Sequence, residues 1–138
     1  MKQIFSKIQP ELLLHVINRY GDIGEERKDL TPEHEFLQTS TFKMKKGKTF
    51  QAHHHLEQIK ETTKTQESWV VIKGSVKLFL YDIDESLLIE EILHPGDCSI
   101  TLHGGHNYLA LEDDTVIYEY KTGPYNGQAK DKQFINVQ

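Results

Sequence analysis

The stretch ESWVVIKGSVKLFLYD, residues 67–82, decides the fold class that the sequence predicts. It holds two runs that are rich in β-branched, aromatic and other apolar residues, and the turn-forming sequence KGS at 73–75 separates them. Short apolar runs bounded by turn residues are typical of β-strands. We therefore expect one strand on each side of Gly74.

Similar patterns continue at short intervals on both sides of this stretch, each ended by turn residues. They are EFLQTSTFKM (35–44), TFQAHHHL (49–56), LLIEEILH (87–94), CSITLHG (98–104), NYLALE (107–112) and TVIYEYKTG (115–123). Many short strands with frequent turns and hardly any helix predict an all-β fold, an antiparallel sandwich or barrel rather than βαβ units. The double-sheet jelly roll is the member of this class that we expect.

The N-terminal part of the chain has a different pattern. PELLLHVINRYG, residues 10–21, fits either a short helix, with Leu13, Ile17 and Tyr20 on one face, or an extended strand. The polar stretch 24–35 contains Pro32 and predicts a loop. We interpret the chain as one domain with three parts: an N-terminal preamble (1–34), a strand-rich barrel (35–125) and a C-terminal tail (126–138).

Composition limits the classes of function. The 138 residues carry 16 Lys plus Arg against 21 Asp plus Glu, and the net charge of -5 argues against binding to a nucleic-acid backbone. The single cysteine, Cys98, cannot form an internal disulfide, and we interpret it as a buried small residue rather than a nucleophile. No apolar run reaches membrane-spanning length and no signal peptide is evident, so we expect no membrane partner and a cytoplasmic location.

Three consecutive histidines, 53–55, stand in the interior of the sequence. On a strand, His53 and His55 would point to one face and His54 to the other. Two imidazoles on one face suit a divalent transition metal, which needs further ligands. Glu67 and His106 are the additional candidates, and Gly104 and Gly105 would let the backbone turn so that His106 points inward.

The order of these residues resembles the two sequence motifs of the cupin superfamily. The first motif corresponds to Gly47, His53, His55, Glu67 and Gly74, and the second to PGD at 95–97 followed by GGH at 104–106. TQE at 65–67 and GPY at 123–125 are similar to segments of a subgroup of small bacterial cupins. The resemblance covers roughly residues 42–125 and implies a jelly-roll barrel with a metal ion inside.

Carried over to this sequence, the resemblance implies that His53, His55, Glu67 and His106 bind the metal. The chain departs from the common pattern at two places: eleven residues separate His55 from Glu67, an enlarged loop, and His106 falls one position early. Glu67 is either a ligand or a base. A shift in the HGGH turn would make His103 the ligand in place of His106.

Other residues are candidates for contact with a substrate. Tyr118 and Tyr120 share a strand face and Tyr125 follows a Gly-Pro turn, so the three could line a pocket or be ordinary core and rim residues. Lys60 lies in the enlarged loop, where it could meet an anionic ligand or simply be solvated.

We expect one divalent transition metal ion, which could be Fe, Mn, Ni, Cu or Zn. With it, the chain could be a dioxygenase or isomerase acting on a small hydroxylated, carboxylated or sugar-like substrate. The alternative is a non-catalytic binding module for a sugar-like or acidic metabolite, and a structural barrel stabilised by its metal is a third hypothesis. Apolar residues on both faces of 70–82 also predict a homodimer.

Overall fold

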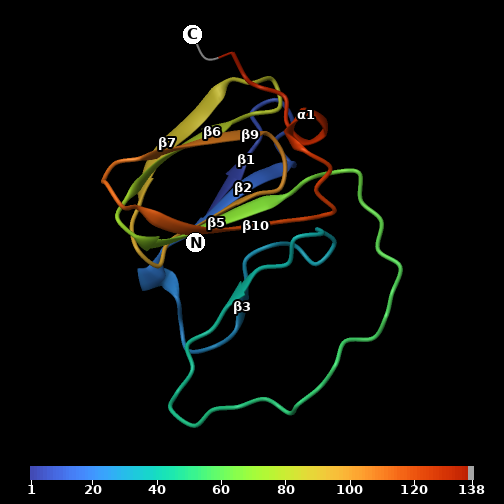
Figure 1. Ribbon diagram of the computed structural model, residues 1–138, viewed down its shortest axis with the longest axis vertical. Helices are drawn as coiled ribbons and strands as arrows, with labels where there is room; N and C mark the ends of the chain where they lie inside the picture. The colour runs from blue at the N-terminus through green and yellow to red at the C-terminus, as the bar shows by residue number, and fades with distance from the viewer. Residues whose placement is uncertain (137–138) are drawn as a thin grey trace.

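The computed structural model describes residues 1–136, and antiparallel β-sheets make up most of its regular structure (Figure 1). One sheet has five strands in the order β1-β2-β8-β5-β10, and a second has three in the order β7-β6-β9. The five strands are β1 (Lys2–Phe5), β2 (Leu13–Asn18), β8 (Cys98–Thr101), β5 (Glu67–Lys73) and β10 (Val116–Lys121). The three are β7 (Leu87–Leu93), β6 (Val76–Tyr81) and β9 (Gly105–Ala110).

Four small elements complete the described structure. β3 (Lys28–Asp29) pairs with β4 (Ser40–Thr41), η1 (Tyr20–Asp22) is a short 3-10 helix, and α1 (Gln128–Asp131) is a single helical turn. No helix within residues 1–136 has the length and apolar character needed to cross a membrane.

The two larger sheets pack face to face around one hydrophobic cluster. Leu78 and Leu80 of β6 are fully buried there against Val71 of β5 and Ile17 of β2. The neighbouring residue Val16 belongs to a second cluster, which must lie on the other face of the five-stranded sheet because successive strand residues point to opposite faces. The second cluster is covered by the segment that contains Leu30. The prediction of an all-β antiparallel sandwich is confirmed.

The N-terminal preamble forms part of this sandwich. Of the two predictions for residues 10–21, the extended one is confirmed over β2, and the helix is wrong. β2 lies between β1 and β8 and all six of its residues are buried. A strand that is buried on both faces has a continuous apolar run instead of an alternating one, which explains why LLLHVI fitted both patterns.

The strand predicted for residues 49–56 is not formed. Residues 42–65 contain no helix or strand, every one of them is exposed, and the segment runs in a wide arc away from both sheets (Figure 1). Only Ser40 and Thr41 of the strand predicted over 35–44 are extended and paired. A strand is stabilised by its cross-strand neighbours, and alternation along one segment does not reveal whether a neighbour exists.

Both sheets end in an unpaired edge. Within residues 1–136, β9 pairs only with β6 and β10 only with β5. The sandwich is therefore open on these sides and does not close into a barrel.

Candidate functional site

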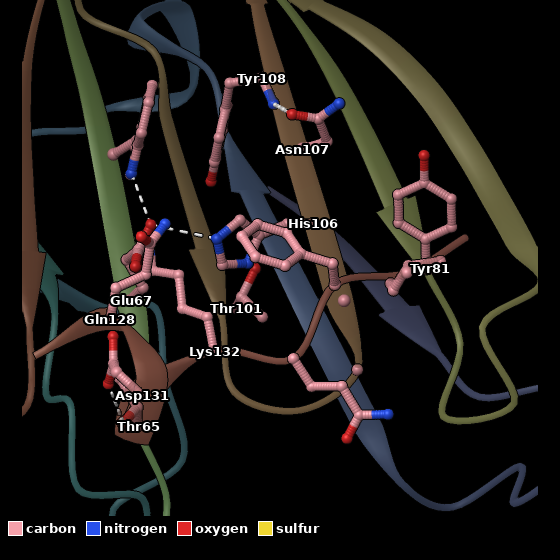
Figure 2. Close-up of a pocket in the computed structure, with 16 residues that line it drawn as sticks. Thr65, Glu67, Tyr81, Thr101, His106, Asn107, Tyr108, Gln128, Asp131 and Lys132 are labelled. Atoms are coloured by element: carbon pink, nitrogen blue, oxygen red, sulfur yellow. Dashed lines mark hydrogen bonds and ion pairs between the residues drawn. The ribbon is translucent and has the colours of Figure 1, made fainter. Parts of the chain in front are cut away.

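Glu67 and His106 meet between the two sheets. Glu67 begins β5 and is 4% exposed, while His106 is on β9. His106 Nε2 lies 3.1 Å from Glu67 Oε1, and Figure 2 shows the two side chains pointing toward one another. His106 is positioned by the turn after β8, where Gly104 has φ of 74° and a Cβ would overlap the carbonyl oxygen of Tyr81. Gly104 thus provides the sharp turn before β9, and His106 on that strand faces Glu67.

The Glu67 carboxylate is held in its charged form. Burial alone would raise its pKa, but His106 and the indole N–H of Trp69, 2.7 Å from Glu67 Oε1, more than offset this and hold the pKa of Glu67 below its usual value. The other ring nitrogen of His106, Nδ1, is buried and has no hydrogen-bond partner within the described residues. The pair therefore combines a carboxylate with an imidazole that has one uncommitted nitrogen.

A cavity of about 530 Å³ opens beside this pair. Trp69 and Tyr108 form part of its wall, with their rings stacked 3.8 Å apart and nearly parallel. Tyr108 Oη lies 2.9 Å from Ser99 Oγ, and burial raises the pKa of the phenol. Tyr108 is thus neutral and acts as an apolar wall with a fixed hydroxyl rather than as a base. A volume of this size accommodates a small molecule.

Residues from the C-terminal part of the chain line the same cavity. α1 and the residues that follow it contribute Gln128 and residues 131–135. Figure 2 shows the Lys132 side chain extending along the cavity toward Glu67, whose pKa it also helps to lower. The cavity therefore has three walls: one from each sheet and one from the C-terminal segment.

His53 and His55 are not in this site. Both are exposed in the 42–65 segment, with ring centroids 5.4 Å apart, and His53 Nδ1 lies 2.8 Å from the carbonyl oxygen of Gln51. The structure therefore brings together two of the four residues predicted to bind metal, Glu67 and His106. Across residues 1–136 no three His, Cys, Asp or Glu side chains are arranged to hold a metal ion.

The residues predicted to contact a substrate also lie elsewhere. Lys60 is exposed in the same segment as the histidines. Tyr118 and Tyr120 are exposed on β10, and Tyr125 is exposed with Lys121 Nζ 4.2 Å from its ring centroid. None of the four lines the cavity around Glu67.

His103, the alternative ligand, faces different partners. Its Nε2 lies 3.5 Å from Glu35 Oε1 and its Nδ1 lies 3.2 Å from Lys64 Nζ. His103 is not among the residues that line the cavity, and His106 is. Of the two histidines in the HGGH turn, His106 is the one directed at Glu67.

Sequence reasoning did not identify several residues of the cavity. Trp69 follows Glu67 by two positions, so strand alternation places both on one face and could have identified it. Tyr108 has the same relation to His106. The C-terminal residues have no comparable signal, because nothing in a polar tail indicates where it folds back.

Comparison of the chain with models of protein families, with curated proteins and with solved structures found no match.

Proposed function

We propose that the chain is a metal-binding protein of the cupin type that holds one divalent transition metal ion and binds a small oxygen-bearing molecule in the cavity. The observation that carries the proposal is the convergence of Glu67 and His106, 3.1 Å apart, at the edge of a small-molecule cavity. Carboxylate oxygen and imidazole nitrogen are common ligands of such ions.

Two ligands are too few for tight binding of such an ion, so the site requires His53 and His55 as well. In the conformation described above these histidines are apart from it, and the 42–65 segment would have to move. Two features support this movement. The segment is exposed throughout, so few contacts hold it, and β9, the strand that carries His106, has an edge that no strand within residues 1–136 covers. An unpaired edge can accept an additional strand.

The surrounding residues of the chain have definite roles in this proposal. Trp69 donates a hydrogen bond that fixes the orientation of the Glu67 carboxylate, and Tyr108 stacks on Trp69 and holds it in place. His106 would turn Nε2 from Glu67 to the ion. A divalent ion at this position would polarise an oxygen ligand or lower the pKa of a bound water, which is the chemistry of a metal-dependent dioxygenase or isomerase.

Hydrogen exchange with and without Zn²⁺ tests the assembly of the site. Zn²⁺ is diamagnetic and accepts mixed nitrogen and oxygen ligands. We expect slower exchange at residues 49–56 when one equivalent of Zn²⁺ is added to protein without an affinity tag. The same experiment on His106→Ala should show no slowing. Exchange at 49–56 that does not respond to Zn²⁺ in the unmodified protein would contradict the proposal.

A second candidate function is a metal-free binding module for a hydroxylated or acidic metabolite. The observation that favours it is that Glu67 and His106 already pair with one another, and no third metal-ligating side chain joins them within residues 1–136. The two candidates differ in their response to a chelator. A small hydroxylated acid that changes Trp69 fluorescence equally with and without EDTA would support the module, and binding that EDTA abolishes would support the metal site.

A further inference from the structure

The segment from Gly127 to Asn136 forms one wall of the cavity although it has little structure of its own. Its only regular element is the single turn α1, and none of the α1 residues is buried. Even so, six of its residues line the cavity: Gln128, Asp131, Lys132, Gln133, Phe134 and Ile135. The segment must therefore be held in place by contacts with the sheets.

One of these contacts is a polar cluster centred on Asp131. The Asp131 carboxylate accepts hydrogen bonds from Lys121 Nζ at 3.1 Å and from Thr65 Oγ1 at 3.0 Å. Lys121 is the last residue of β10 and Thr65 precedes β5, so a single carboxylate ties the segment to both strands. The two hydrogen bonds also hold the pKa of Asp131 below its usual value, which keeps it charged near neutrality.

The second contact is apolar and lies next to His106. The side chain of Ile135 packs against Gly105, at the start of β9, so closely that a Cβ at this glycine would overlap it. Asp131 thus fastens one end of the segment to the five-stranded sheet, and Ile135 fastens the other end to the three-stranded sheet. The segment bridges the two sheets over the cavity.

We propose that the Gly127–Asn136 segment is a lid, latched by Asp131, whose opening admits small molecules to Glu67 and His106. A partly exposed ion pair stabilises a structure only weakly, and segments with few buried apolar contacts open without global unfolding. The latch is therefore weak enough to release without unfolding the two sheets. This inference concerns access to the cavity and does not depend on whether a metal binds there.

Trp69 provides a direct measure of the lid. It is the single tryptophan of the chain and lines the cavity, so quenching of its fluorescence by acrylamide reports how easily a small molecule enters. Asp131→Asn and Lys121→Met each break the latch from one side, and we expect either variant to increase the quenching constant about two- to fivefold, as loss of a partly exposed ion pair allows. The double variant should increase it no further, because both changes remove the same interaction.

Glu90→Gln provides the matched control. Glu90 of β7 forms an ion pair with Lys77 of β6 at 2.6 Å on the three-stranded sheet, and neither residue lines the cavity. Its removal should leave the quenching constant unchanged. Ile135→Ser loosens the lid at its other end without altering either sheet, and it should increase quenching in the same way.

Two results would contradict the proposal that this segment is a lid. One is a quenching constant that stays at the value of the unmodified protein in Asp131→Asn, Lys121→Met and Ile135→Ser, with circular dichroism showing that each variant is folded. The other is an equal increase in Glu90→Gln, which would show a general loosening of the fold.

Discussion

Acidification should destabilise the protein through one buried histidine, His15. This residue of β2 is completely buried, with Nε2 lying 3.0 Å from the carbonyl oxygen of Tyr81 and Nδ1 lying 3.1 Å from Thr101 Oγ1. A carbonyl oxygen only accepts, so Nε2 carries the proton and Nδ1 accepts from the threonine hydroxyl. Protonation of Nδ1 would place a charge in the core, and Nδ1 could then no longer accept from the threonine hydroxyl.

The size of this effect on the free energy of unfolding follows from the pKa of His15. Burial is the main cause that lowers the pKa of His15 from 6.5 to about 4. Each pKa unit corresponds to about 1.4 kcal/mol, so the full effect on the free energy of unfolding is about 3 kcal/mol. The unfolded chain binds the proton more readily, so this stability is intact above pH 6.5 and is lost as the pH falls toward 4.

Urea unfolding at pH 7.5 and pH 5 measures this loss. Linkage predicts that the free energy of unfolding falls by about 2 kcal/mol over this range because of His15 alone. His15→Gln keeps a hydrogen-bond donor and an acceptor at this position without titrating, and its stability should change much less between the two pH values. An equal pH dependence in His15→Gln and in the unmodified protein would show that His15 does not cause the loss of stability.

Three further predictions concern the core, the turn before β9 and the carboxylate of the site. Leu80→Ala removes a fully buried side chain between the sheets and should cost about 2–5 kcal/mol in urea unfolding. Gly104→Ala forces φ of 74° on alanine and a clash with the Tyr81 carbonyl, so its melting temperature should fall well below that of Gly21→Ala, where a Cβ meets nothing. Glu67→Gln should reduce the loss of stability below pH 4.5, because the lowered pKa of Glu67 makes its contribution present above that pH and lost in more acidic solution.

Local sequence patterns predicted the strands that are strongly apolar or that pair with a strand close to them in the sequence. The six strands β5 to β10 all lie within the stretches predicted to form them, apart from the start of β9, which begins at Gly105, two residues before its stretch. The patterns did not predict β1, and they could not choose between helix and strand for β2, because burial on both faces removes the alternation that distinguishes them.

The candidate site was predicted only in part, for a related reason. Glu67 and His106 were identified from turn and strand positions, and the structure brings them together. The alternation of His53 and His55 was equally clear in the sequence. Alternation within one segment, however, does not show whether another strand pairs with that segment. The contribution of Asp131 depends on where a polar tail folds back, and local periodicity carries no information about that.

The proposed binding of one metal ion by Glu67, His106, His53 and His55 can be tested by counting tightly bound metal with mass spectrometry. Three single variants should be compared after reconstitution with one divalent ion at a time and removal of the excess: His53→Ala, His54→Ala and His106→Ala. We expect close to one ion per chain in the unmodified protein and in His54→Ala, and almost none in His53→Ala and His106→Ala. Equal losses at positions 53 and 54, or an unmodified protein that retains no metal, would rule out this four-residue metal site.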